Sequence, residues 1–356
     1  MFTGIPLWCI IVVIKGPVEV STYPRGLEIF LKSLWCFYRR VYMKPYKVFT
    51  NIDEQIDILK KRGLIFYSEE TAKLALKRHG YYNIINGYKD PFVADCAEEK
   101  FKDNVSFEQI YDFYILDKKI RLLLMETMLE VESQLKTATA YVIAKVYSSD
   151  DAKYLKRTNY KLGRKKNGKF LLDELLYKFE KIKNDHNDPF WYYKNHYDNI
   201  PPWILMNGLT FGNLANFIKL QKSDVKKQII SMIYDIPSNF VSDDIVDLFM
   251  DSVFVYLAYR NASAHGDRIY KFSPTSSFRY SALLHPVAKI SEMEYRHGVG
   301  MNDLNILIHS LMLFNDNSIH ENLSSNFFQL LMDHIKKYPN SHEYLYVYLP
   351  LNKYRQ

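Results

Sequence analysis

The sequence SFEQIYDFYILDKKIRLLLMETMLEVESQLKTATAYVIAKVY, residues 106–147, carries the longest helical pattern of the chain. Apolar residues recur along it at intervals of three, four or seven, the spacing that lines one face of an α-helix. These residues are Ile110, Phe113, Ile120, Leu124, Val131, Leu135 and Ala138. An unbroken helix over this range would be about 60 Å long at about 1.5 Å per residue, and we expect one break in it. Charged side chains decorate its remaining faces: Asp117, Arg121, Glu126, Glu130, Glu132 and Lys136.

Shorter helices are predicted on both sides of this stretch. Thr50 and Asp53 resemble a capping box before a helix that ends at Gly63. Ser68 is a suitable N-cap for a second helix that ends at Gly80. Further helical patterns lie at 170–183, around Gln221 and Met232, and at 242–265, 304–314 and 327–338. Few segments alternate in the manner of strands, so the predicted fold class is all-α.

The helical patterns and the loops between them suggest four regions. They are an N-terminal extension at 1–42, a small helical module at 43–100, a helical core at 101–285 and a C-terminal helical region at 286–356. Met43 opens a more ordinary protein start, which leads to the hypothesis that 1–42 lie upstream of the true initiation site. The apolar run IPLWCIIVVI at 5–14 is too short to span a bilayer and lacks the positive flank of a signal peptide.

Cysteine usage bears on compartment and on metal binding. Cys9, Cys36 and Cys96 share no short spacing and do not form a usual zinc pattern with nearby histidines. A reducing compartment is the simpler interpretation. We therefore expect a cytoplasmic protein with no membrane contact, no metal site and no other cofactor.

The net charge of +7 is concentrated in one segment, KYLKRTNYKLGRKKNGK at 153–169, which we call the basic loop. It contains eight Lys and Arg residues and no acid, so the rest of the chain is close to neutral. Cations release counterions from phosphates, and Tyr154 and Tyr160 could stack on bases, which favours RNA as the partner. The candidate RNA-binding residues are Lys156, Arg157, Lys161, Arg164, Lys165 and Lys166. A solvated lysine loop without a ligand is an equal alternative.

A polar cluster closes the predicted helix at 242–265, within LAYRNASAHGDRIY at 257–270. Ser242 is a suitable N-cap and Gly266 a suitable helix end. Asn261 and His265 are i, i+4 neighbours, and the long side chain of Arg260 can reach the same region. The partial negative charge at the helix C-terminus favours the cationic forms of Arg and His. A second Arg…His match in RYSALLH, at Arg279 and His285, lacks the adjoining Asn and is interpreted as chance.

RNASAH resembles the R-N-x-x-x-H signature of the HEPN superfamily of metal-independent ribonucleases, and its surroundings resemble the bacterial abortive-infection (Abi) family. The likeness runs from about residue 44 to 314. The segments that carry it are KPYKVFTNIDEQIDILKKRGL, GYYNIINGY, LDKKIRLLLMETMLEVESQLK, PPWILMNGLTFGNLANF and LAYRNASAHGDRIY. Lys136 stands where an arginine is expected, and Tyr259 and Ala262 are uncommon flanks of the motif, which leaves enzymatic activity open.

The resemblance implies an all-α HEPN-like bundle, a role in defence against bacteriophage, and Arg260, Asn261 and His265 as catalytic or RNA-contacting residues. The chemistry agrees, because cleavage by the 2′-hydroxyl needs proton transfer, for which His265 is suited, and a grip on the phosphate, for which Arg260 is suited. The expected product carries a 2′,3′-cyclic phosphate. Asn261 would orient the histidine or the phosphate. A single histidine cannot be base and acid in one step, so a homodimer with a composite site is expected.

Other interpretations remain open at this stage. Arg260 could pair with Glu132 or Glu130 in a structural role, and Glu132 could instead support the active site. The alternative function is a non-cleaving RNA-binding or interaction protein of a defence or toxin–antitoxin system. A regulatory RNA or an antitoxin is a further partner that the resemblance implies. The connector aromatics Trp191, Tyr192, Tyr193 and Trp203 are interpreted as core or interface residues rather than as platforms for bases.

Overall fold

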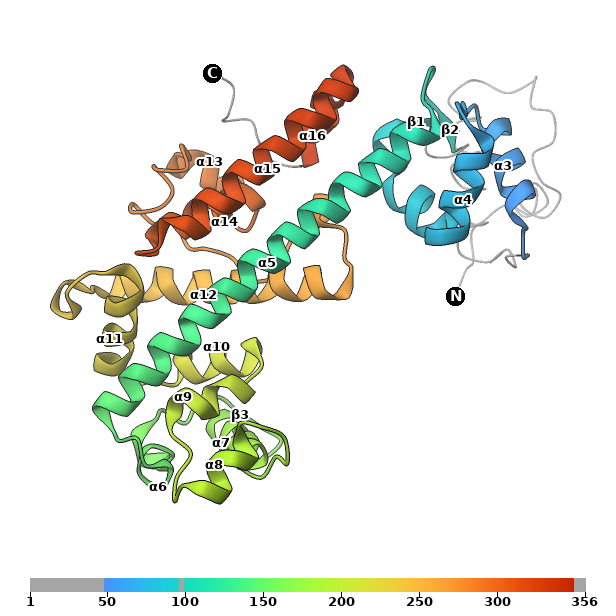
Figure 1. Ribbon diagram of the computed structural model, residues 1–356. Coiled ribbons are helices and arrows are strands. Elements are labelled where there is room, and N and C mark those ends of the chain that lie inside the picture. Colours follow the sequence, from blue (N-terminus) through green and yellow to red (C-terminus); the bar gives the residue numbers. More distant parts are fainter. Residues whose placement is uncertain (1–47, 96–98, 349–356) are drawn as a thin grey trace, which may run out of the picture. The chain divides into compact units, whose positions relative to one another are not determined.

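The structure is a computed structural model that describes residues 48–95 and 99–348 (Figure 1). This part of the chain is mainly α-helical, which confirms the predicted fold class. Its two sheets are two-stranded antiparallel hairpins, one of β1 (Val93–Asp95) with β2 (Lys100–Phe101) and one of β3 (Lys165–Lys166) with β4 (Lys169–Phe170). The predictions for 1–42, Met43 and the three cysteines concern residues outside the described ranges.

The chain divides into two compact units, Met1–Ile58 and Leu59–Gln356. In the described part of the first unit, α3 (Ile52–Lys61) begins with a capping box. The box is made by Asn51 and Glu54, because the Glu54 amide donates to Asn51 Oδ1 over 2.9 Å and the Asn51 amide donates to Glu54 Oε2 over 2.8 Å. The predicted pair of Thr50 and Asp53 was wrong by one residue.

Helix α5 (Phe107–Val146) is the central element of the second unit. It is 40 residues long and unbroken, so the expected break was wrong. Ser106 caps it as predicted, with its side chain accepting from the Gln109 amide. The helix contains neither Gly nor Pro, and α4, α9, α11, α12 and α15 pack against it in turn along its length. Tertiary packing, more than intrinsic helix propensity, stabilises most protein helices. The packing of these neighbours on α5 therefore supports a single uninterrupted helix.

The remaining helices follow the chain order shown in Figure 1. They are α4 (Glu69–His79), α6 (Asp151–Tyr154), α7 (Leu171–Lys183), α8 (Phe190–His196), α9 (Pro202–Leu205), α10 (Phe211–Lys219), α11 (Ser223–Tyr234), α12 (Asp243–His265), α13 (Glu292–Arg296), α14 (Leu304–Ser310), α15 (Asn317–Lys337) and α16 (His342–Tyr348). Short π- and 3₁₀-segments include Tyr82–Asn86, Asp90–Phe92 and Met206–Gly208.

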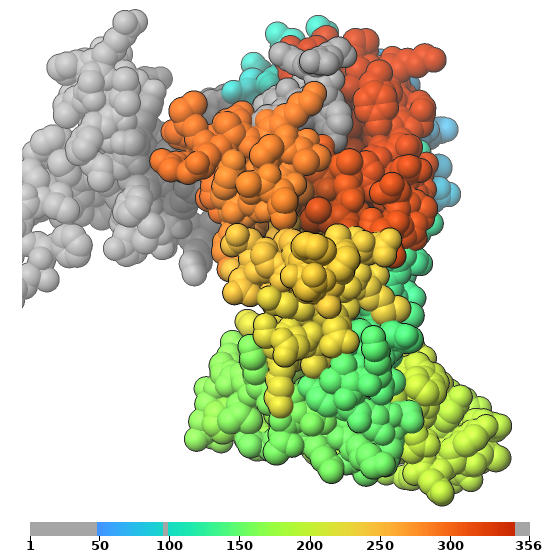
Figure 2. Space-filling view, turned by 90° about the vertical axis from the view of Figure 1, so that its left-hand side faces the viewer, coloured from blue at the N-terminus to red at the C-terminus, as the bar shows by residue number. Residues whose placement is uncertain are grey.

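Helices α12 and α15 both pack on α5, and α14 packs on α12 and α15. Figure 2 shows the yellow residues of the segment that contains α11 between the orange and red C-terminal residues above and the light-green residues below. The contact between α12 and α14 includes a hydrogen bond of 2.8 Å between Tyr256 Oη and Ser310 Oγ, both buried. This packing fixes α12 against α5 and α14.

No helix in the described ranges is both long enough and apolar enough to cross a lipid bilayer.

Candidate functional site

The last two turns of α12 carry the R-N-x-x-x-H motif. Ser242 caps the start of the helix as predicted, and Gly266 ends it in the left-handed conformation at φ +79°. The amide of Asp267 donates to the Ala262 carbonyl over 2.9 Å, which completes the C-terminal turn. Arg260, Asn261 and His265 therefore lie at the end of a helix whose two ends are both closed by local hydrogen bonds.

Two of the three motif side chains face solvent. Asn261 and His265 are exposed, and four residues of helix place them about 6 Å apart along the axis and nearly on the same side. Tyr259 and Ala262 point the other way and are buried. The Tyr259 hydroxyl donates to the Asn302 carbonyl over 3.0 Å, so the inner side of the helix is fixed while the motif remains accessible.

Arg260 is half-buried and faces a carboxylate of α5. Its Nε lies 3.7 Å from Oε2 of Glu132, which is 6% exposed. The other oxygen, Oε1, lies 2.9 Å from Nζ of Lys136. Glu130, the other candidate partner, is exposed and accepts instead from Gln134. The acid beside Arg260 is therefore Glu132, held between two cations.

The Arg260 contact is an ion pair without a hydrogen bond. Both Arg260 Nε and Glu132 Oε2 are buried atoms for which the described residues provide no hydrogen-bond partner. Nε is the guanidinium nitrogen nearest Glu132, and within the described ranges the two Nη groups donate to no acceptor. A guanidinium in this arrangement can still make a bidentate contact with a phosphate.

Two residues of α5 that were expected on its surface hold the segment after the motif. Arg121 Nη1 donates to the carbonyls of Gly266 and Asp267 over 2.9 and 3.2 Å. Asp117 is fully buried, so its predicted place on an outer face was wrong. Its carboxylate accepts from the Tyr270 amide over 2.8 Å and from the Ile269 amide over 3.3 Å. These bonds fix the chain as it leaves α12.

The same carboxylate accepts from the Tyr88 hydroxyl over 2.7 Å. Burial raises the pKa of Asp117, although the hydrogen bonds from Tyr88 and Tyr270 oppose this.

The guanidinium of Arg268 lies 5.4 Å from the centroid of the Tyr82 ring. A side chain at Gly87 would come within 3.1 Å of Arg268 Nε, so the glycine leaves room for this arginine. The GYYNIINGY segment thus supports the end of α12, a role that its sequence pattern does not signal.

The last part of the basic loop forms a β-hairpin. Asn167 and Gly168 have φ values of +50° and +80°, as in the two-residue turns of β-hairpins, and join β3 to β4. All six predicted RNA-binding residues are exposed: Lys156, Arg157, Lys161, Arg164, Lys165 and Lys166. Arg157 pairs with Asp173 of α7 over 2.8 Å, which leaves the others as the more available cations.

The two tyrosines of the basic loop are not available to bases. Tyr154 is fully buried and donates to the Ile200 carbonyl over 2.7 Å, and Tyr160 is 5% exposed. Their expected role in stacking was wrong, because both rings anchor the loop in the core. The aromatic ring beside the cations is Phe170, with Lys165 Nζ 5.4 Å from its centroid.

The motif and the basic loop contact α5 far from each other. Arg260 of the motif faces Glu132, whereas the Tyr147 hydroxyl donates to the Asn159 carbonyl of the basic loop over 2.9 Å. Glu132 and Tyr147 are 15 positions apart, or roughly 22 Å along the helix axis. The two regions are therefore separate surfaces on one rigid element.

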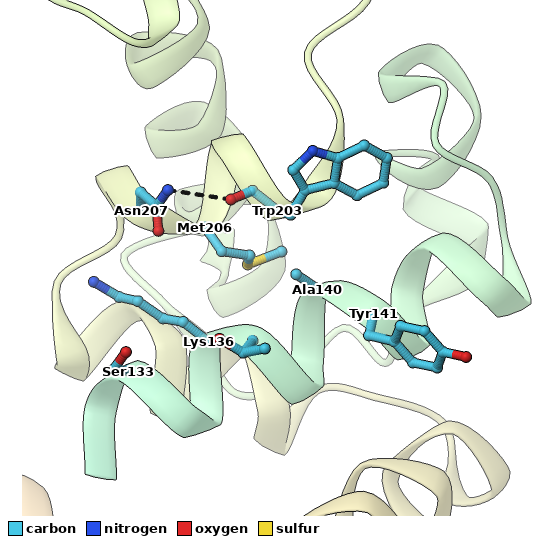
Figure 3. A pocket seen from close by; sticks show the side chains of 8 residues that line it. Ser133, Lys136, Ala140, Tyr141, Trp203, Met206 and Asn207 are labelled. Carbon is cyan, nitrogen blue, oxygen red and sulfur yellow. Dashed lines mark hydrogen bonds between the residues drawn. The ribbon is translucent and has the colours of Figure 1, made fainter. Parts of the chain in front are cut away.

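A pocket lies between them on α5, with a volume of about 320 Å³ (Figure 3). It is lined by Ser133, Lys136, Thr137, Ala140 and Tyr141 of α5 and by Trp203, Met206 and Asn207. Trp203 is 51% exposed, and Trp191 and Tyr192 are also exposed. The interpretation of these three aromatics as core residues was therefore wrong. The pocket escaped prediction because no local pattern joins 133–141 to 203–207.

The second Arg…His match has a structural role. Arg279 binds Asp247 and Asp251 of α12, and its Nε lies 2.8 Å from Asp251 Oδ2. His285 is fully buried, accepts from the Ser281 amide at Nδ1 and lies 3.2 Å from the Gly300 carbonyl at Nε2. Burial lowers the pKa of His285. Unlike the motif of α12, this second match has a buried histidine and does not lie at the end of a helix.

The described ranges contain no cluster of His, Cys, Asp and Glu that could hold a metal ion. Residues 74–271 match the model of a family described as Abi-like protein, which covers more than half of the chain. No curated protein and no protein of solved structure matches the chain.

Proposed function

Because the chain belongs to the Abi-like protein family, which is associated with abortive infection as a defence against bacteriophage, we propose that it acts as a metal-independent endoribonuclease. The observation that carries this proposal is the end of α12. There the exposed side chains of Asn261 and His265 adjoin Arg260, whose Nε faces the buried Glu132. The set combines a proton-transfer group, a phosphate-binding group and an amide on a rigid support.

Each group has a defined task in cleavage by transesterification. His265 removes the proton from the 2′-hydroxyl, whose oxygen then attacks the adjacent phosphorus. The Nη groups of Arg260 bind the phosphate oxygens as negative charge builds up on them. Asn261 orients the imidazole or the phosphate by hydrogen bonding. The bond to the 5′-oxygen breaks, which leaves a 2′,3′-cyclic phosphate on one fragment and a 5′-hydroxyl on the other.

The departing 5′-oxygen must receive a proton while His265 is accepting one. A second copy of the chain with its motif across the same cleft would provide this acid as a protonated imidazole. The proposed active form is therefore a homodimer. Sedimentation velocity at the assay concentration tests this part, and a monomer that cleaves RNA would contradict it.

Cleavage of single-stranded RNA by the His265→Ala variant tests the reaction itself. We expect a loss of about 10²- to 10⁴-fold in rate, the usual contribution of an acid–base group, with RNA affinity retained. His186→Ala, at an exposed histidine of the connector, is the matched control. Glu132→Gln should lower the rate by about tenfold, since the ion pair to Arg260 weakens, while Glu130→Gln should have no effect.

A non-cleaving RNA-binding protein is the second candidate function, and the exposed cations of the basic loop favour it. In that case wild-type protein and His265→Ala would bind RNA equally and leave it intact. Sequencing of RNA ends separates the two functions, because only the nuclease produces new 2′,3′-cyclic phosphates that disappear in the His265→Ala variant.

A further inference from the structure

We propose that the pocket formed by Ser133–Tyr141 of α5 with Trp203, Met206 and Asn207 binds one unpaired nucleotide of the RNA strand, outside the bond that is cleaved. The identity of the strand rests on the proposed function. The pocket itself is argued from its lining, its charge and its place on α5.

The first argument is the exposed indole of Trp203. Figure 3 shows this ring standing over Ala140 of α5, with Met206 below it. Ala140 and Met206 are almost completely buried, whereas Trp203 is 51% exposed. An exposed aromatic face above an apolar floor is the arrangement on which single-stranded bases stack, because every base has a flat π-face.

The second argument is the charge at one end of the pocket. Lys136 lines the pocket and also contacts Glu132, which is shared with Arg260. Two cations and one carboxylate leave the cluster with one net positive charge. The ammonium of Lys136 has three donors, of which Glu132 takes one, so the others can bind a phosphate or a base oxygen. The pocket thus combines a stacking wall with a cationic end.

The third argument is the orientation of Asn207. Its Nδ2 donates to the backbone carbonyl of Trp203 over 3.2 Å, which fixes the orientation of the amide. Figure 3 shows the amide at the same end of the pocket as the Lys136 ammonium. The remaining N–H and the oxygen of Asn207 can bind the edge of a base whose face lies on Trp203.

The fourth argument is the order of the three surfaces along α5. Arg121 contacts the end of α12, Glu132 contacts Arg260, Ser133–Tyr141 line the pocket, and Tyr147 contacts the basic loop. Lys136 is one turn, or about 6 Å, beyond Glu132. A strand whose phosphate is held by Arg260 therefore reaches the pocket before it reaches the basic loop.

The test measures RNA affinity with a fluorescent single-stranded oligonucleotide of mixed sequence, using the His265→Ala protein as the parent so that the probe stays intact. Adding Trp203→Ala should weaken binding by about tenfold or more, the usual effect of losing one stacked base. Trp203→Phe should stay close to the parent, since it keeps an aromatic face. Trp191→Ala, at another exposed connector tryptophan, is the control and should leave affinity unchanged.

Thr137 is exposed, and Thr137→Trp would fill the pocket. This variant should weaken RNA binding as Trp203→Ala does. It provides a second test if the Trp203→Ala protein does not fold. Parental affinity in either folded variant, or an equal loss in Trp191→Ala, would overturn the proposal. With His265 restored, Trp191→Ala should cleave RNA at the wild-type rate, because Trp191 does not line the pocket. If the wild type cleaves nothing, the nuclease proposal fails while the affinity comparison still decides the subsite.

Discussion

The end of α12 and the basic loop are both positively charged, but the fold holds them in opposite ways. At the end of α12, Asp117 and Arg121 bind the backbone that follows the motif, and Glu132 faces Arg260. In the basic loop Tyr154 and Tyr160 are buried, but the side chains of Lys161 and of residues 164–166 are exposed. Proton transfer requires groups fixed within a fraction of an ångström, whereas attraction of a polyanion does not. We therefore propose proton transfer for the first region and electrostatic capture of RNA for the second.

The largest expected effect concerns stability. Asp117→Ala removes the acceptor for three donors, the Tyr88 hydroxyl and the amides of Ile269 and Tyr270, and leaves them unsatisfied in the core. We expect the free energy of unfolding to fall by about 3 kcal/mol, measured by urea denaturation. Asp267→Ala, at an exposed neighbour, should change it by less than about 0.5 kcal/mol. Equal stability of the two variants would show that the hydrogen bonds of Asp117 do not stabilise the end of α12.

The second effect is a pH dependence of the scaffold. Burial lowers the pKa of His334 on α15 to about 4, below its ordinary value of about 6.5. The folded state therefore disfavours the protonated imidazole. Its contribution to stability is complete above about pH 6.5 and is lost as the pH falls toward about 4, by about 3 kcal/mol.

Because α15 packs on α5, acid should destabilise the support of the motif independently of any titration in the active site. His334→Gln should flatten the fall in unfolding free energy between about pH 6.5 and pH 4.5, measured by urea denaturation at each pH. An unchanged slope in this variant would assign the acid sensitivity to other groups.

The smallest effect concerns the basic loop. Replacing Arg164, Lys165 and Lys166 together with Gln should leave unfolding unchanged, since all three side chains are exposed. The slope of log affinity against log salt concentration should become shallower by about 2. Each of the three lost phosphate contacts accounts for about 0.7 on single-stranded RNA. The rate of cleavage at saturating RNA should not change. An unaltered salt dependence would indicate that the basic loop is a solvated segment that does not bind RNA.

The sequence alone determined those features that depend on neighbouring residues. Ser106 and Ser242 begin helices because a hydroxyl can satisfy a free amide two or three positions later, and Gly266 ends one because it adopts a positive φ without strain. Apolar spacing revealed the long helix. The Asn167–Gly168 pair was an available hairpin signal in the basic loop that escaped prediction.

Only the tertiary structure decided which polar and aromatic residues lie inside. Asp117 and Glu132 read as outward-facing charges on α5, yet both are buried, because the segment after α12 and Arg260 cover them. Tyr154 is buried and Trp203 is exposed, the reverse of what their surroundings in the sequence indicate. Helix caps and turns depend on contacts within a few residues, whereas burial depends on segments that are distant in the sequence, 46 positions away for Tyr154 and 153 for Asp117. Local sequence therefore located the motif, and long-range packing decided what surrounds it.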